Sequence, residues 1–385
     1  MEVVARCVRG IEWVAAAEAA GRLGAAVVRT RHREVWLSGA LAVPAWTALR
    51  TVDDVFIRAG ITRGVGHTRN DLLVLSRATS QLDWTAAVAE AERPRGTFDV
   101  VGSFLGKRNY NRFEVEQAVG GRVSAQTGWT YRRRSRDRSF PGDVPLTIRV
   151  HVEGDEAVLG IRLADRPLHR RPWKNYDAPG SLHPPVAAAM GLVAGLRPGV
   201  VLVDPLCGAG TIGIEAALAE PTARTFMSDL SRATVIAAGN NARAAGVAGR
   251  LVVARADAGS PPLRPGSVDR LVTNPPWGRK VRPEGQLRSG WPSFMTAMTA
   301  ALSRQGRAVL LVDTEEVAAL AAAAGEVGWA VLDTFRLSVS GAWVTSVVLA
   351  ADRAPGIDPG SRYGPELAAE LAARLNLAPT RVAPA

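Results

Sequence analysis

The second half of the chain alternates short apolar runs with longer amphipathic stretches, and this alternation limits the possible folds more than any other feature. From residue 200 on, apolar runs of four to six residues are separated by stretches of ten to fifteen residues with helical periodicity. This order is typical of βαβ units, in which helices cover a parallel sheet. It predicts strands at 200–204, 223–229, 250–257, 269–274 and 307–313, helices near 210–219, 231–245, 292–304 and 314–327, and an edge hairpin formed by 328–339 and 342–350.

The first half of the 385 residues mixes strands and helices without that regular alternation. It predicts two small α+β units. The first has a strand and helix over 7–25, a strand at 33–39 and a helix over 44–58; the second has helices at 82–93 and 112–128 and strands at 97–104, 145–154 and 156–164. A stretch rich in Pro and Arg then indicates a linker. The expected division is 1–70, 71–165, a linker at 166–184, an α/β domain at 185–352 and a tail at 353–385.

The positive charge of the chain is concentrated in its first half. The whole chain carries a net charge of +11, and residues 1–180 hold 28 basic and 20 acidic residues, a net charge of +8. A field of this kind attracts polyanions, although an arginine-rich composition alone could also produce it. We favour nucleic acid, and the following residues are candidates for contact with its phosphates: Lys107, Arg108, Arg112, Arg132, Arg133, Arg134, Arg136, Arg170, Arg171 and Lys174.

A glycine-rich turn follows the first strand of the α/β region, in VVLVDPLCGAGTIGIEAAL. Glycines allow a tight turn and a close approach of a ligand to the backbone. The motif lacks the Lys and Ser or Thr of a phosphate-binding P-loop, which is therefore excluded. A dinucleotide site stays possible, but Asp204 precedes the glycines, whereas the nicotinamide pattern has its acid one strand later. In that position Asp204 could bind a cationic amino group, which suits a nucleotide that bears an amino acid.

Two further acids lie at the ends of the next two predicted strands. Asp229 follows Asp204 by 25 residues and could accept both hydroxyls of a ribose, and Asp257 could bind the exocyclic amine of an adenine. Each acid alone could equally be a helix cap. Three acids at three successive strand ends favour a nucleotide site instead.

The loop NPPWG, which begins at Asn274, follows the fourth predicted strand. Proline cannot donate to a sheet ladder, so the chain leaves the sheet here in a stiff turn. The Asn274 side-chain oxygen and the Pro275 carbonyl could each accept one N–H of a planar amine and align it with a methyl donor. Trp277 could stack on an extruded base. The alternative is an ordinary Pro-Pro turn with a core tryptophan.

These motifs together resemble those of S-adenosylmethionine-dependent amino-methyltransferases. Segments of the first half resemble a ferredoxin-like domain and a THUMP domain, in the order found in THUMP-containing RNA guanine-N2 methyltransferases. The resemblance implies a Rossmann-like class I methyltransferase domain preceded by α+β ferredoxin-like and THUMP domains. It implies cofactor contacts from Asp204, Cys207, Gly208, Gly210, Thr211, Asp229, Asp257 and Asn274, and catalytic roles for Asn274, Pro275, Pro276 and Trp277.

The resemblance implies methyl transfer to N2 of a guanine in structured RNA, most readily transfer RNA. A 23S ribosomal RNA substrate is the nearest alternative, because the same two modules serve it. A similar loop also serves adenine in DNA and glutamine in release factors, but neither requires a basic RNA-binding half. The other class of function is a non-catalytic RNA-binding or assembly factor that retains the fold.

Several classes of protein are disfavoured by what the sequence lacks. The two cysteines, Cys7 and Cys207, are far apart, and we expect buried thiols instead of a disulfide. The five histidines show no HxxH or HxxxH spacing and no CxxC occurs, so we expect no metal site. No long uncharged apolar run or signal peptide is evident, which favours a cytoplasmic protein without membrane contact.

Overall fold

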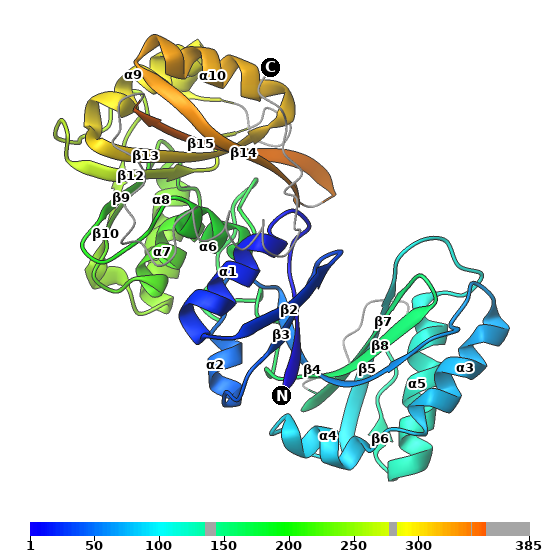
Figure 1. Ribbon diagram of the computed structural model, residues 1–385. Coiled ribbons are helices and arrows are strands. Elements are labelled where there is room, and N and C mark those ends of the chain that lie inside the picture. Colours follow the sequence, from blue (N-terminus) through cyan, green and yellow to red (C-terminus); the bar gives the residue numbers. More distant parts are fainter. Residues whose placement is uncertain (135–143, 277–282, 340, 352–385) are drawn as a thin grey trace.

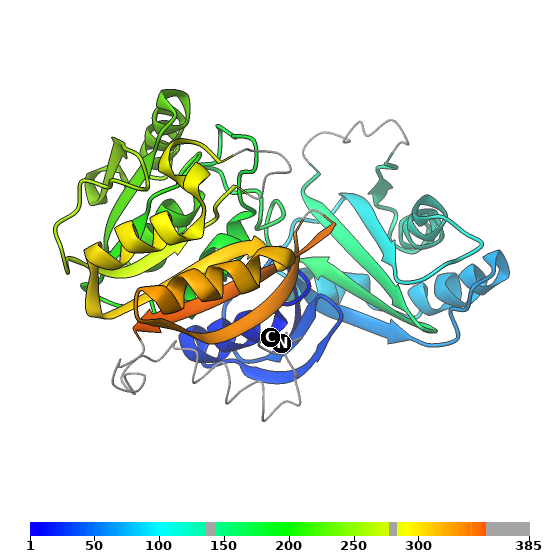
Figure 2. The ribbon, with the colours of Figure 1, turned by 90° about the horizontal axis from the view of Figure 1, so that it is seen from above.

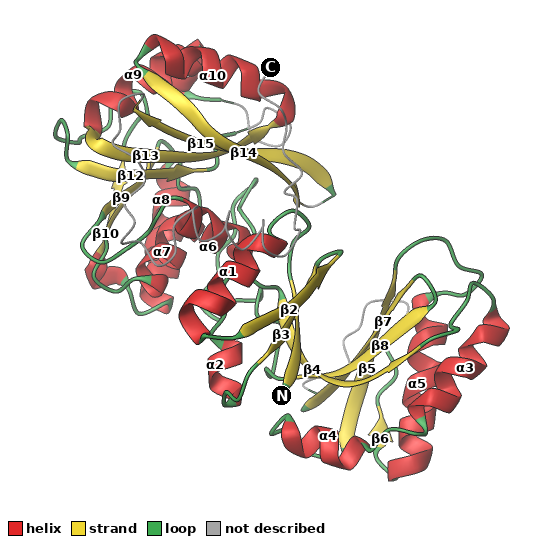
Figure 3. Ribbon diagram, viewed as in Figure 1, coloured by secondary structure: helices red, strands yellow, loops and turns green. Residues whose placement is uncertain are grey.

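The computed structural model describes residues 1–134, 144–276, 283–339 and 341–351. Within these ranges the chain forms an eight-stranded sheet in the first half and a seven-stranded sheet in the second, each with helices packed on it (Figures 1 and 3). No helix of the described ranges has the length and apolar character needed to cross a membrane.

The seven-stranded sheet has the order β11-β10-β9-β12-β13-β15-β14. The strands from β11 to β13 are parallel, whereas β15 is antiparallel to both of its neighbours, as the predicted hairpin requires. The strands are β9 (Val201–Asp204), β10 (Arg224–Asp229), β11 (Leu251–Arg255), β12 (Val268–Thr273), β13 (Leu302–Asp313), β14 (Trp329–Val339) and β15 (Ala342–Ala351). The α/β prediction is confirmed, and the strand order reverses between β9 and β12, where ligands bind in sheets of this kind.

Helices cover both faces of this sheet. Residues of α9 and α10 pack on one face, and those of α6, α7 and α8 pack on the other. The helices are α6 (Pro184–Val193), α7 (Thr211–Ala219), α8 (Arg232–Ala244), α9 (Trp291–Ala301) and α10 (Val317–Glu326), with short 3-10 turns η2 (Ala248–Arg250), η3 (Gly285–Ser289) and η4 (Thr314–Glu316). The predicted helices therefore agree with the structure to within a few residues at each end.

The eight-stranded sheet runs through both units of the first half, in the order β2-β3-β1-β4-β8-β7-β5-β6. Helices α3, α4 and α5 pack on its second part (Figure 1). The elements are β1 (Glu2–Arg6), α1 (Glu12–Leu23), β2 (Ala26–Arg31), β3 (Glu34–Ser38), α2 (Val43–Thr47), β4 (Asp54–Thr62), η1 (Arg69–Asp71), α3 (Leu72–Thr79), α4 (Trp84–Glu90), β5 (Thr97–Phe104), α5 (Arg112–Thr127), β6 (Thr130–Tyr131), β7 (Leu146–Glu153) and β8 (Glu156–Arg162).

The helix predicted over 44–58 is wrong in its second part, because α2 ends at Thr47 and β4 begins at Asp54. The segment DVFIRAGIT is rich in β-branched and aromatic residues, which favour a strand. β4 pairs with β1 through Val55 and with β8 through Ile57, so one strand joins the two units. The strand predicted at the start of 7–25 is also misplaced, because β1 ends at Arg6, and α3, β2 and β6 have no counterpart among the predicted elements.

The first unit contacts the seven-stranded sheet directly and lies between that sheet and helices α3 to α5 (Figures 1 and 2). The rings of Trp13 in α1 and Phe335 in β14 meet edge to face, 5.2 Å between centroids. The Ser338 backbone N–H donates to the Arg9 carbonyl at 2.9 Å. These side chains belong to one continuous apolar core that spans both halves.

A buried ion-pair network ties the same halves together. Glu215 of α7 is fully buried and accepts hydrogen bonds from the Nε atoms of Arg50 and Arg171, each at 2.8 Å. The Arg171 side chain is only 8% exposed, and a second donor of its guanidinium reaches the Arg50 carbonyl at 2.6 Å. The candidate role of Arg171 in phosphate contact is therefore wrong: a buried carboxylate holds it inside the protein.

We expect Glu215→Gln to destabilise the full chain by about 3 kcal/mol, because removal of one partner leaves buried guanidinium charge without compensation. Urea denaturation of the two proteins measures the difference. Glu326→Gln, at an exposed position in α10, serves as the control and should change stability by less than about 0.5 kcal/mol. Equal losses in both variants would contradict a special role for Glu215.

Candidate active site

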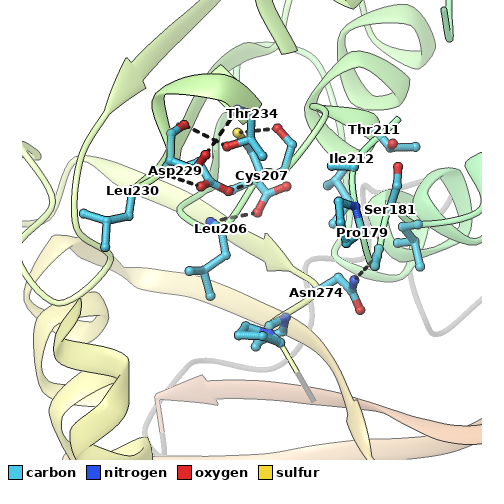
Figure 4. Close-up of a pocket in the computed structure, with 18 of the residues that line it drawn as sticks. Pro179, Ser181, Leu206, Cys207, Thr211, Ile212, Asp229, Leu230, Thr234 and Asn274 are labelled. Carbon is cyan, nitrogen blue, oxygen red and sulfur yellow. Dashed lines mark hydrogen bonds between the residues drawn. The ribbon is translucent and has the colours of Figure 1, made fainter. Parts of the chain in front are cut away.

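A cavity of about 860 Å³ opens at the carboxyl ends of β9, β10 and β12, at the reversal of strand order. Its walls come from the glycine turn, the three strand ends and the linker before α6 (Figure 4). The lining includes most of the predicted site residues that the structure describes: Asp204, Cys207, Gly208, Thr211, Asp229, Asp257, Asn274, Pro275 and Pro276. Gly210 contributes to the turn without lining the cavity, and Trp277 lies outside the described residues.

The glycine turn needs its glycines for two different reasons. Gly208 and Gly210 have φ angles of 51° and 83°, which residues with a Cβ rarely adopt. A Cβ on Gly213 would lie 2.3 Å from the sulfur of Met227, so that glycine allows α7 to pack closely on β10. Together they place the N-terminus of α7, with Thr211, at the cavity wall.

Asp204 lies at the end of β9 and is 1% exposed. Its Oδ1 accepts hydrogen bonds from the Thr273 hydroxyl at 2.8 Å and from the Leu206 N–H at 3.3 Å. Burial, with a further contribution from the charge of Asp229, raises the pKa of Asp204 to about 7. Asp204 therefore changes its charge near neutral pH, and a cation in the cavity would favour its ionised form.

Asp229 holds the glycine turn against the end of β10. Its Oδ2 accepts the Gly208 N–H and its Oδ1 accepts the Ser231 N–H, each at 2.9 Å. Each carboxylate oxygen can accept a second hydrogen bond, so the group can still receive ligand hydroxyls from the cavity. Asp229 is thus both a structural support of the turn and a candidate ligand contact.

Asp257 lies two residues after the end of β11 and supports the opposite wall. Its Oδ1 accepts the Gly259 N–H at 2.8 Å, and its Oδ2 accepts the Gln286 N–H at 3.1 Å. A Cβ on Gly285 would lie 2.2 Å from Oδ2, which explains the glycine at this position. These contacts hold η3, whose Leu287 lines the cavity.

Asn274 follows β12, where its amide reaches the cavity (Figure 4). Its Nδ2 donates to the Gly180 carbonyl at 3.3 Å. Its Oδ1 is buried and has no hydrogen-bond partner among the described residues. An unsatisfied buried acceptor costs free energy, and a ligand that supplies the missing donor is one explanation for it. The site therefore presents an acceptor beside the stiff Pro275 and Pro276.

The stretch SLHPPVAAAM (181–190) resembles the segment that covers the cofactor in the family, but no role at the site was predicted for the linker residues before it. Residues 177–182 line the cavity opposite the glycine turn. Asn241 of α8 is fully buried and binds this linker, since its Oδ1 accepts the N–H groups of Asn175 and Tyr176 at 3.1 and 3.0 Å. Its Nδ2 donates to the carbonyls of Tyr176 and Ala209 at 2.9 and 3.0 Å. The only sequence signal was a polar residue on an apolar helix face.

The candidate RNA-contact residues fall into two groups. Lys107, Arg112, Arg132 and Arg133 are exposed. Arg108 is half-buried, where it donates to the carbonyls of Gly66 and Gly154 at 2.8 and 2.6 Å, and Arg134 pairs with Asp99 at 2.9 Å. Arg136 lies outside the described residues. Of the ten candidates, Arg108, Arg134 and Arg171 therefore bind partners within the protein, as does Lys174, which pairs with Asp177 at 2.8 Å.

Comparison with known proteins decides the family. The sequence profile of the RMKL-like methyltransferase domain matches residues 171–345. The tRNA (guanine(6)-N2)-methyltransferase of Thermus thermophilus is 35% identical over 247 residues, which cover 63% of this chain and 69% of that protein. The chain belongs to this methyltransferase family. The resemblance predicted from the glycine turn and the Asn-Pro-Pro loop is thereby confirmed.

Other members and structures extend the comparison. The ribosomal RNA large subunit methyltransferase K/L of Photobacterium profundum is 31% identical over 151 residues, covering 39% of this chain and 20% of that protein. The crystal structure of TrmN from Thermus thermophilus has a TM-score of 0.72 and 27% identity, covering 91% of this chain and 99% of that one. The structure of SMU.472 complexed with SAH has a TM-score of 0.69 at 17% identity, covers 91% of this chain and 98% of that one, and shows the same fold.

We expect Asn241→Ala to release the linker from α8, because four hydrogen bonds of a buried amide are lost. Amide hydrogens of Asn175 and Tyr176 should exchange at least about tenfold faster, as measured by hydrogen exchange with mass spectrometry. Asn240→Ala is the matched control, since the neighbouring Asn240 side chain accepts from Arg243 and does not bind the linker. Unchanged exchange in Asn241→Ala would contradict the proposed clamp.

Proposed function

We propose that this chain transfers a methyl group from S-adenosylmethionine to the exocyclic N2 amine of a guanine in transfer RNA. The observation that carries the proposal is the buried, unpartnered Oδ1 of Asn274 at a cavity lined by acidic strand ends. An amine brings the N–H donors that this acceptor lacks. The name of the Thermus relative specifies guanine 6, so this nucleotide is the first to test.

The charge of the cavity and the open space beside its glycine turn support S-adenosylmethionine as the cofactor. The Asp204 carboxylate suits the cationic amino group of the methionine part, and the free acceptor positions of Asp229 suit the ribose hydroxyls. An atom added at the Cβ position of Gly208 would meet nothing within 4 Å, so the turn leaves open space for a ligand. Asp257 and the wall that it supports are assigned to the adenine. When bound, S-adenosylmethionine supplies an electrophilic methyl carbon.

The residues of the Asn-Pro-Pro loop act by positioning and by electrostatics. The lone pair of an exocyclic amine is delocalised into the base, which makes the amine a poor nucleophile. In our mechanism the Asn274 Oδ1 and the Pro275 carbonyl each accept one N–H and hold the nitrogen in line with the methyl carbon. The same two oxygens stabilise the positive charge that develops on nitrogen. The proton then leaves to solvent or to a carboxylate.

We further propose that residues 1–70 and 71–165 are the ferredoxin-like and THUMP domains of the family and that they bind RNA. The excess of positive charge over residues 1–180 supports this assignment, as do the exposed Lys107, Arg112, Arg132 and Arg133. Because transfer RNA is a cytoplasmic substrate, the protein would act in the cytoplasm.

Two other functions can be separated from this one. A ribosomal RNA substrate is supported by the Photobacterium relative, but that match covers only 39% of this chain, whereas the Thermus relative named as a tRNA methyltransferase covers 63% of it. A non-catalytic RNA-binding factor would not need an acidic cavity with an unpartnered amide oxygen. The broader match to the Thermus tRNA methyltransferase therefore favours transfer RNA.

The test uses the purified full chain with labelled S-adenosylmethionine and, in parallel, transfer RNA and ribosomal RNA from a strain that lacks the gene. We expect N2-methylguanosine in the transfer RNA by nucleoside mass spectrometry. Asn274→Ala should lower kcat by at least about a hundredfold, because a positioned acceptor is lost, while the Kd for the cofactor changes little.

Each alternative gives a different result in this experiment. Methylation of ribosomal RNA alone would replace the proposed substrate. Cofactor and RNA binding without turnover would support the non-catalytic factor. Equal loss of turnover and cofactor affinity in Asn274→Ala would show that the loop has been assigned the wrong role.

Cofactor binding should depend on pH through Asp204. Because its pKa is about 7, the group is mostly neutral at pH 6 and ionised at pH 8, and only the ionised form attracts a cation. The affinity for S-adenosylmethionine should therefore rise by about tenfold between pH 6 and pH 8. Asp204→Asn should bind more weakly and with little of this dependence, as calorimetric titration can show. A parallel pH profile in the variant would assign the dependence to another group.

A further inference from the structure

Three potential metal ligands meet at the joint between the first unit and the linker. Asp53 precedes β4, and His169 and His183 lie near the two ends of the linker. One donor atom from each of these three side chains lies within 4.8 Å of the others. The two imidazole rings are 5.2 Å apart between centroids. Because the ligands come from separate segments, the spacing of histidines in the sequence could not reveal them.

The hydrogen bonds within this group orient the donors. The His183 Nε2 lies 2.7 Å from the Asp53 Oδ1, and the His169 Nδ1 lies 3.2 Å from the Asp53 carbonyl oxygen. Since a carbonyl only accepts, the His169 Nδ1 carries a proton and its Nε2 keeps a lone pair. A histidine that donates one ring N–H to a carbonyl and keeps its other nitrogen free has the usual arrangement of a metal ligand.

The three side chains are partly accessible to solvent, and Arg33 partly compensates the negative charge of Asp53. The side chains of His183 and Asp53 are 32% and 15% exposed. Arg33 contacts the other carboxylate oxygen, Oδ2, at 3.3 Å, which leaves Oδ1 for a cation. Neutral imidazole and carboxylate are ligands that Zn²⁺ prefers, and three protein ligands leave one position for water.

We propose that Asp53, His169 and His183 form a binding site for a divalent transition-metal ion of the Zn²⁺ type. The ion would replace the proton between His183 and Asp53, and modest rotation of the side chains would bring the donors to the Zn–N distance of about 2.0–2.1 Å. This site is separate from the cavity and departs from the expectation of no metal. Because Arg33 adds positive charge beside Asp53, we expect the site to bind the ion more weakly than a structural zinc site does.

The position of the site gives it a consequence for the linker. His169 and His183 bracket the segment 170–182, and residues 177–182 line the cavity. A metal ion bound at both ends would fix this segment to the first unit through Asp53. The ion would therefore order a cavity wall without touching a cavity ligand.

The test is equilibrium dialysis of the full chain against ZnCl₂, with metal content measured by mass spectrometry. We expect one saturable zinc ion per chain. Asp53→Asn and His183→Ala should each weaken binding by about tenfold or more. His67→Ala, which removes an exposed histidine from the segment between β4 and α3, is the control and should bind like the wild type.

A second variant keeps the result interpretable if a ligand variant folds poorly. Arg33→Gln removes the competing cation and should bind zinc several-fold more tightly, which a merely structural Asp53 would not produce. Zinc should also slow hydrogen exchange over 170–182 in the wild type but not in His183→Ala. Absence of saturable binding up to about 1 mM, or equal binding by wild type, Asp53→Asn and His183→Ala, would overturn the proposal. Methyl transfer enters none of these measurements, so their failure would leave the proposed function intact.

Discussion

The arrangement of the two halves depends on one buried carboxylate. Glu215 lies in the helix that begins at the glycine turn, and it binds one arginine from the first unit and another from the linker. A buried charge is unfavourable unless its partners stay in place, so the pairing selects a single relative position of three segments. The apolar contact of Trp13 with Phe335 adds packing at the same junction. Together they explain why a basic α+β half and an α/β half share one core.

From this junction, three successive contacts fix the path of the linker along the cavity. Arg171 anchors its beginning, Asn241 holds its middle against the glycine turn, and the Gly180 carbonyl receives the amide of Asn274. Because this contact uses the Asn274 Nδ2, the Oδ1 of the same amide is left without a partner among the described residues. A segment without regular secondary structure thus sets the orientation of the group to which we assign catalysis.

The parts that the sequence predicted best are those with local causes. The alternation of apolar runs and helices is a local pattern, and the strand-end acids and the Asn-Pro-Pro loop follow from it because parallel strands end at one edge. The prediction failed where partners are distant in sequence. The segment after Thr47 is a strand because β1 and β8 flank it, and the roles of Arg171 and Asn241 depend on groups 44 and 65 residues away. The three residues of the proposed metal site could not be predicted for the same reason, because they are far apart in the sequence.

The strand β4 has a mechanical consequence of its own. Its first residues pair with β1 of the first unit, and the rest of the strand pairs with β8 of the second unit. The eight-stranded sheet therefore continues across the boundary between the units. A hinge would require breaking that ladder, and none is expected there. An RNA bound beside helices α3 to α5 would then lie at a fixed distance from the cavity. That distance would determine which of its nucleotides can enter the cavity.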